Sequence, residues 1–173
     1  MKNFAIISLS FYIFLILFLP KNEIYYTFEK QLKTFNISLT DETFENNGYN
    51  LVVNDAQLRW EGNSIGIVEN IKLNPFMFWN SFEVSNITLT PDMASFLPRK
   101  IESFSFTQHI FSPTLLKFKA NGDFGKLDGF FDAKEKRMFV SIELSSNSTA
   151  KYKLLLSEFK YNDGKWVYDE ILK

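Results

Sequence analysis

The sequence predicts a mainly β fold with a few helices (α+β), in which one curved antiparallel sheet or sandwich carries two packing amphipathic helices. Three patterns support this prediction. Short segments alternate between apolar and polar residues, with turn signals between them. Two other segments repeat apolar residues at helical spacing. The N-terminus is almost entirely apolar, as in a transmembrane helix. We therefore divide the 173 residues into a membrane anchor over 1–21 and a β-rich domain over 22–173.

The N-terminal apolar run extends from Phe4 to Leu19 and is interrupted only by Ser8 and Ser10. As a helix it would be about 24 Å long, which is short of a hydrocarbon core of about 30 Å. A cleaved signal peptide and a buried core helix therefore stay open as alternatives. The flank Phe18–Lys21 lacks the small residues of a cleavage site, which favours an uncleaved signal-anchor. Lys2 favours a cytoplasmic N-terminus.

Two amphipathic helices are predicted in the β-rich domain. The first covers residues 22–35, because four apolar residues share one helical face: Ile24, Phe28, Leu32 and Phe35. The second covers residues 149–162 and has a similar stripe: Tyr152, Leu155, Leu156 and Phe159. Gly164 suits a left-handed position just after this helix.

Strands are predicted from alternating apolar and polar residues between turn signals. The most regular unit is a hairpin over residues 122–144, which turns at the charged run Lys134–Arg137. In the segment 64–73, Ile65, Ile67, Ile71 and Leu73 share one face if a bulge lies near Glu69. The other predicted strands cover residues 52–60, 82–89, 101–111, 114–120 and 165–171, with a short helix after Thr90 and before Pro98.

Composition excludes several classes of function. The formal net charge is −1, whereas a nucleic-acid-binding domain usually carries a basic excess, so no direct nucleic acid contact is expected. The absence of cysteine excludes disulfides, thiolate metal sites and a cysteine nucleophile. The 20 phenylalanines are enough to bury a substantial core.

No pattern of residues points to catalysis, so the sequence predicts a protein that is not an enzyme and needs no cofactor or metal. His109 is the only histidine, and no second nitrogen ligand or thiolate completes a transition-metal site. Asp123, Asp128 and Asp132 alternate with glycines, but their spacing fits hairpin turns better than a calcium loop.

Two apolar features have more than one interpretation. The insert Pro75, Phe76, Met77, Phe78 and Trp79 is a candidate contact with a partner or a membrane, or else it plugs one end of the sheet. Eight phenylalanines could line a lipid groove or simply fill the core: Phe104, Phe106, Phe111, Phe118, Phe124, Phe130, Phe131 and Phe139.

Two phrases in the sequence carry a family resemblance. The first joins Val68–Pro75 to Phe82–Leu89 as strand, loop and strand, and the second is Leu116–Gly129. Both resemble the periplasmic β-repeats of AsmA-like proteins and of the type II secretion system protein N. A single N-terminal anchor before such a domain is also similar to the lipopolysaccharide-transport protein C. Small anchored proteins of this kind accompany secretion-like DNA-uptake machines in Campylobacter-type bacteria.

The resemblance implies a single-pass protein of the bacterial inner membrane, with its C-terminal domain in the periplasm. Its first implied function is a structural or assembly component of a type II secretion-like, pilus or DNA-uptake apparatus. The partners would then be the lipid bilayer, through the N-terminal helix, and other envelope proteins. The alternative is a periplasmic lipid-binding or lipid-transfer module of the AsmA or lipopolysaccharide-transport type. No catalytic residues are implied.

Overall fold

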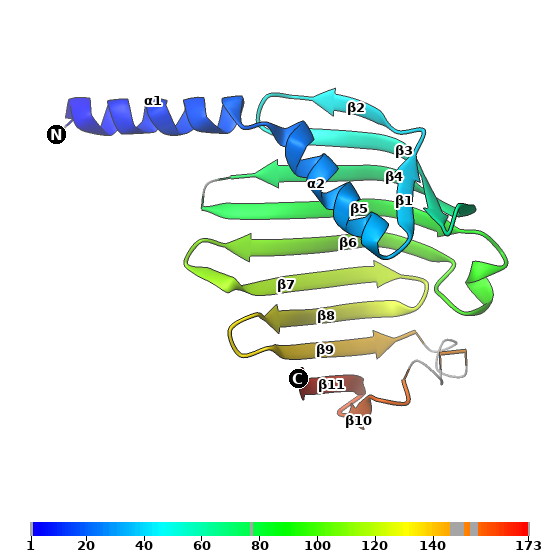
Figure 1. Ribbon diagram of the computed structural model, residues 1–173. Helices are drawn as coiled ribbons and strands as arrows, with labels where there is room; N and C mark the ends of the chain where they lie inside the picture. The colour runs from blue at the N-terminus through cyan, green and yellow to red at the C-terminus, as the bar shows by residue number, and fades with distance from the viewer. Residues whose placement is uncertain (1, 77, 146–150, 153–155, 173) are drawn as a thin grey trace.

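In the part of the chain that the structure describes, the fold is one antiparallel sheet of 11 strands with two helices at its N-terminal end (Figure 1). The computed structural model describes residues 2–76, 78–145, 151–152 and 156–172. The strand order is β1-β3-β4-β5-β6-β7-β8-β9-β11-β10, and β2 also pairs with β3. From β3 to β9 every strand therefore lies beside its neighbour in sequence. The prediction of a mainly β, α+β fold is confirmed, as a single sheet and not a sandwich.

Most of the predicted strands form within a few residues of their expected bounds, because alternation and turn signals agree there. The strands missing from the prediction are the short ones, β1, β2 and β10. The full set is β1 (Ile37–Thr40), β2 (Thr43–Asn46), β3 (Leu51–Trp60), β4 (Asn63–Pro75), β5 (Trp79–Leu89), β6 (Lys100–His109), β7 (Ser112–Gly122), β8 (Gly125–Asp132), β9 (Arg137–Leu144), β10 (Lys160–Asn162) and β11 (Lys165–Ile171), with a 3₁₀ turn at Met93–Ser95.

The two helices meet at a bend beside the sheet. Helix α1 (Lys2–Phe18) extends away from the sheet along the strand direction, whereas α2 (Lys21–Thr34) crosses one face of the first strands (Figure 1). Among the described residues no single helix is long and apolar enough to span a bilayer. Residues 4–18 and 21–34 together meet that test by length and composition, with a 50° bend between them.

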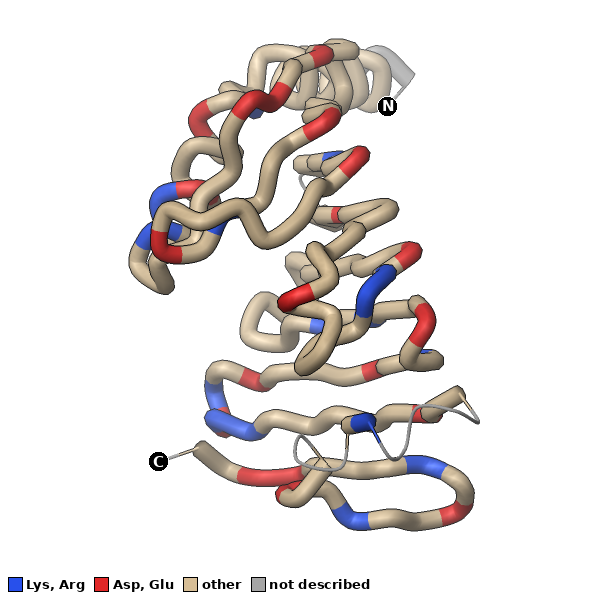
Figure 2. The backbone as a smooth tube through the Cα atoms, turned by 90° about the vertical axis from the view of Figure 1, so that its right-hand side faces the viewer, with Lys and Arg blue, Asp and Glu red and all other residues tan. Residues whose placement is uncertain are grey.

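The sheet is strongly twisted. One of its faces is covered near the first strands and near the last strands, but not in the middle. Seen along the central strands, the last strands run across the view, while α2 lies on one side of the first strands (Figure 2). The main core lies under α2, where Tyr25 packs with Leu51, Val53 and Ile71. A smaller core surrounds Phe124, Tyr152 and Leu156 near the other edge of the sheet.

A line of irregular positions crosses the first strands and changes which residues face the core. Asp55 and Asn86 have positive φ, and both are skipped in the pairing of β3, β4 and β5. Glu69 is skipped with them, but the register is the same on both sides of it, since Asn54 pairs with Asn70 and Ala56 with Val68. The predicted bulge near Glu69 is therefore not present, and the three strands are irregular together instead. The face assignment in β4 was wrong, however: Val68 is buried, whereas Ile67 is 53% exposed on the other face. Because one residue of each strand is skipped at the same level, the alternation of buried and exposed residues reverses on one side of this line.

The predicted C-terminal helix over residues 149–162 is corrected where the structure describes it. Residues 151–152 and 156–158 form turns, and Lys160–Asn162 forms β10; residues 149, 150 and 153–155 lie outside the described residues. Asp163 and Gly164 both have positive φ and form the hairpin turn into β11. Asn-Asp-Gly is typical of such hairpin turns as well as of helix ends, and pairing with β11 decides between them.

Candidate functional site

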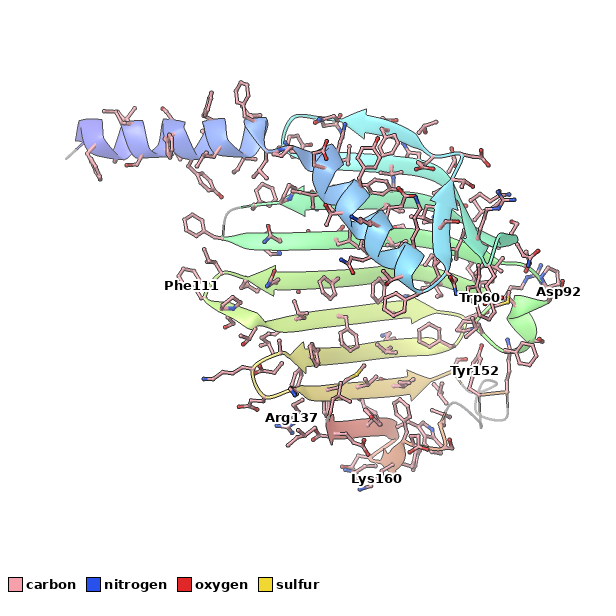
Figure 3. All side chains as sticks on the ribbon, viewed as in Figure 1. Trp60, Asp92, Phe111, Arg137, Tyr152 and Lys160 are labelled. Atoms are coloured by element: carbon pink, nitrogen blue, oxygen red, sulfur yellow. The ribbon has the colours of Figure 1, made fainter. Side chains whose placement is uncertain are left out.

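A continuous apolar face extends across the middle of the sheet, on the side that carries α2. Cross-strand register places Phe82 opposite Phe106, Phe106 opposite Phe118, and Phe131 opposite Met138. Figure 3 shows aromatic rings standing in front of the strands below α2. Strand alternation gives the following set, which we call the apolar face: Phe82, Phe104, Phe106, Leu116, Phe118, Phe131, Met138, Val140 and Ile142.

A groove of about 730 Å³ opens at the α1 end of this face. One wall comes from the helices and the other from β4, β5 and β6. Most of the lining is apolar, with side-chain amides and one hydroxyl as its polar groups. The lining residues are Leu19, Ile24, Phe28, Leu73, Asn74, Pro75, Phe76, Asn80, Ser81, Phe82, Phe104, Phe106 and Gln108.

Helix α2 forms the wall of the groove that lies opposite the strands. Ile24 and Phe28 are two residues of its apolar stripe, and the ring of Phe28 lies 4.4 Å from that of Phe82, centroid to centroid. Leu19, at the bend between α1 and α2, also lines the groove. The groove therefore begins where the exposed helix α1 meets the sheet.

Beyond α2 the apolar face continues outside both core clusters, and no described helix packs on it. Phe106, Phe118 and Phe131 are only half-buried, and among the described residues they belong to neither core cluster. The ring of Phe118 lies against Gly129, where a Cβ atom would collide with it. A glycine at this position lets the ring lie down on the sheet, which keeps the face shallow and continuous.

The opposite face of the same strands is polar. Lys119 and Asp128 form an exposed ion pair at 3.5 Å, and Ser103, Ser105 and Asn121 lie around it. Two predicted groove residues, Phe130 and Phe139, lie on this face, where their rings stack at 5.4 Å. One face of the sheet is thus apolar and the other is mainly polar.

The predicted insert is divided between the groove and its rim. Pro75 is buried and Phe76 half-buried, and both line the groove, whereas Phe78 and Trp79 are exposed at the tip of the β4–β5 loop. Met77 lies outside the described residues. The ring of Phe78 lies 5.5 Å from that of Tyr12 in α1. The first two residues of the insert thus pack at one end of the sheet, as a plug would, and Phe78 and Trp79 are exposed, as a contact with a partner or membrane would be.

The other predicted positions are dispersed. Phe111 projects from the β6–β7 loop at the α1 end (Figure 3), and Phe124 is buried in the smaller core. His109 stacks on Trp79 at 6.4 Å. Among the described residues no group of His, Asp or Glu side chains is arranged to hold a metal ion.

The three aspartates lie in different parts of the hairpins. Asp123 accepts hydrogen bonds from the backbone amides of Arg99 and Lys100, and Asp132 accepts one from that of Lys134. Asp128 faces Lys119 in mid-strand. The interpretation of the first and last as turn residues agrees with these bonds.

Sequence reasoning missed several lining residues. Leu19 and Asn80 carried no signal of their own, and Gln108 looked like an ordinary strand residue. The stripe that includes Ile24 and Phe28 was found, but only as a packing face. A groove wall made of α2 required the knowledge that α2 crosses β4 and β5.

No family model matches this chain, and no curated protein or solved structure matches it.

Proposed function

We propose that this protein is a membrane-anchored lipid-binding module that holds an acyl chain on its apolar face. One observation carries the proposal: the apolar groove of about 730 Å³ begins at Leu19, where α1 ends, and continues onto an apolar face with half-buried rings. This is the alternative function that the sequence suggested. A fully packed core would have argued against it.

The shape and chemistry of the groove favour an acyl chain over a polar ligand. Its polar groups are few and neutral, so a charged or sugar-like ligand would lose hydration without replacement. Each buried methylene contributes about 0.8 kcal/mol, so a chain lying on several rings can bind without specific polar contacts. An open face also tolerates ligands of different length.

Helix α1 would supply the connection to the membrane. Its large apolar side chains are exposed nearly all round, from Phe4 to Phe18, and only Ile16 is buried. An uncovered apolar helix is stable only where something apolar surrounds it. We propose that this surrounding is a bilayer, in which α1 is a signal-anchor. Placement in the inner membrane with the domain in the periplasm remains a proposal from the resemblance.

The test is lipid retention by the full-length chain. Protein extracted from membranes in mild detergent is analysed for co-purified lipid, and its binding of a photoactivatable fatty acid is measured. Phe106→Glu should abolish labelling, because it places a carboxylate in the groove. Thr107→Glu is the matched control on the polar face, opposite Lys117, and should leave labelling unchanged. Equal labelling of the two variants would refute lipid binding at the apolar face.

A second candidate is supported by the edge of the sheet. The short β10 pairs only with Lys165–Val167, so Tyr168–Ile171 have no neighbouring strand on that side among the described residues. An unpaired edge is a template for a partner strand. This supports the assembly component of a type II secretion-like, pilus or DNA-uptake apparatus that the sequence first suggested.

Crosslinking separates the two candidates. A photoreactive residue at Glu170, on the free edge, is compared in living cells with one at Asp128, which lies between paired strands. Recovery of an envelope protein from Glu170 alone supports an assembly role. If neither position captures a protein, the edge has no partner strand and this candidate fails.

A further inference from the structure

We propose that the α1 end of the sheet carries a second membrane-contact surface, made by the tips of the β4–β5 and β6–β7 loops. This surface, the ridge, consists of Phe78, Ile110 and Phe111, and it enters the acyl layer of the adjacent leaflet. The inference rests on the proposed insertion of α1. It adds where the domain itself meets the bilayer and from which side lipid reaches the groove.

The ridge is one unit built from two loops. The backbone amide of Ile110 donates a hydrogen bond of 3.1 Å to the carbonyl oxygen of Phe78. The rings of Phe78 and Phe111 stack at 6.5 Å with an interplanar angle of 7°. Despite these contacts the side chains stay open to the outside: Phe78 and Ile110 are 50% exposed and Phe111 is 87% exposed. The loops hold each other, and the apolar groups point outward.

Helix α1 fixes the depth of the ridge. Phe78 contacts Tyr12, which precedes the last residue of α1 by six positions, or about 9 Å along the helix. One leaflet contributes about half of a 30 Å hydrocarbon core. If α1 lies in the bilayer up to Phe18, a loop that reaches Tyr12 lies within the acyl chains of that leaflet. No movement of the domain is needed.

Two amphipathic side chains, Trp79 and His109, lie next to the ridge, one residue along the chain from Phe78 and Ile110. The ring of Trp79 stacks with that of Phe76, at 6.0 Å, and with that of His109, at 6.4 Å. Tryptophan is enriched where hydrocarbon meets headgroups, because its ring is apolar and its N–H is polar. The order from tip to sheet is therefore apolar, then interfacial, then polar strand, as expected of a segment that crosses this boundary.

The opposite end of the sheet lacks this organisation. Large apolar side chains are exposed there too, at Phe35, Trp60 and Phe96. Among the described residues none of the three takes part in a ring pair (Figure 3 labels Trp60). Within the described part of the chain, only the α1 end combines joined aromatic loops with an apolar helix.

The ridge also defines the entrance of the groove. Phe76 lines the groove and stacks on Trp79 behind the ridge, while Leu19 lines the groove at the end of α1. An acyl chain can pass from the leaflet between these two residues without leaving an apolar surface. The source of ligand is then the adjacent leaflet itself.

Single-cysteine labelling tests the ridge cleanly, because the chain has no cysteine of its own. Full-length protein in phosphatidylcholine–phosphatidylglycerol vesicles carries an environment-sensitive fluorophore at Phe111→Cys, at Phe96→Cys as the matched exposed control, or at Ile7→Cys in α1. We expect blue-shifted emission, quenching by brominated acyl chains and loss of iodide quenching at positions 111 and 7, but not at 96.

The outcomes separate the ridge from the anchor. A protected position 7 with position 111 as open to iodide as position 96 overturns the ridge and leaves the anchor standing. Iodide access at both 7 and 111 overturns both. Lipid binding is measured separately with the photoactivatable fatty acid, so a protein that binds no lipid can still insert its ridge.

A second variant tests the entrance. In Ile110→Ser/Phe111→Ser, two exposed side chains become polar, so folding should be retained. We expect slower loading of labelled lipid from vesicles, and unchanged binding of a fatty acid presented from solution. Unchanged loading from vesicles would show that lipid reaches the groove by another route.

Discussion

At the residue scale, the phenol of Tyr25 is a polar group in an apolar core. The side chain is fully buried between α2 and the first strands, and its hydroxyl has no hydrogen-bond partner among the described residues. Burial raises the pKa of this phenol well above its ordinary value, with smaller contributions from Glu42 and Glu29. The buried hydroxyl therefore lowers the stability of the folded domain.

Tyr25→Phe should therefore stabilise the domain by about 1 kcal/mol, since it removes an unsatisfied group without a cavity. The pH dependence has a definite sign. Above the unfolded pKa of about 10 the unfolded phenol ionises while the folded one stays neutral, so stability is lost as pH rises from there. Urea unfolding at pH 7 and pH 11 measures both effects. Tyr49→Phe, at an exposed position, is the control and should leave the stability at pH 7 unchanged.

Gly129 is the residue on which the shape of the apolar face depends. A Cβ here would collide with the Phe118 ring and lie 2.6 Å from the carbonyl oxygen of Phe139. Gly129→Ala should destabilise the domain by about 1–3 kcal/mol and lift the ring off the sheet. Asp128→Ala, one position away on the polar face, should stay within about 0.5 kcal/mol. Equal unfolding midpoints for the two variants would contradict the described packing.

At the element scale, the joint between α1 and α2 is held by one side chain. Lys21 is buried, and its ammonium donates to the carbonyl oxygens of Ile16, Leu17 and Leu19 at 2.8, 3.4 and 3.4 Å. The carbonyls of Ile16 and Leu17 belong to the last turn of α1, whose acceptors have no partner within the helix, and a cation there also favours the helix dipole. The cap fixes the direction in which α1 leaves the domain.

Lys21→Met keeps the volume of the side chain and removes the cap. We expect a broader distance distribution between spin labels at Ile7 and Gln31, measured by double electron–electron resonance, because the bend is no longer fixed. Lys30→Met removes an exposed lysine from α2 and serves as the control. A distribution as narrow as that of the control would mean that backbone geometry alone sets the bend.

Elements were predictable from sequence where local and tertiary preferences agree. The hairpin of β8 and β9 is an example, since its alternation, glycines and charged turn all indicate one structure. Prediction failed for Ile67, because the irregularity at Asp55, Glu69 and Asn86 involves three strands at once. It failed at residues 160–162, because the turn at Gly164 fits a helix end equally well. Of the eight phenylalanines named from the sequence, Phe104 and Phe106 line the groove, and Phe130 and Phe139 show that a list of rings does not assign a face.

At the scale of the whole molecule, ligand binding should raise the free energy of unfolding and the melting temperature. A lipid that binds the folded groove and not the unfolded chain stabilises it by about 2.7 kcal/mol at a hundredfold excess over Kd. For a domain of this size that is roughly 5–10 °C in Tm. Thermal melts with and without a soluble fatty acid measure the shift. Phe106→Glu should melt at one temperature in both conditions, and a shift in that variant would place the ligand elsewhere.

The uninterrupted order of the strands from β3 to β9 has a consequence for how such a protein changes over evolutionary time. Each antiparallel hairpin leaves and returns at the same end of the sheet. Inserting or deleting one hairpin therefore widens or narrows the apolar surface by two strands, or about 10 Å, without moving either terminus to the wrong end. The loops at the α1 end and the loops at the far end keep their positions. If the apolar face binds lipid as we propose, its ligand capacity can thus vary in whole steps while the position of α1 stays constant.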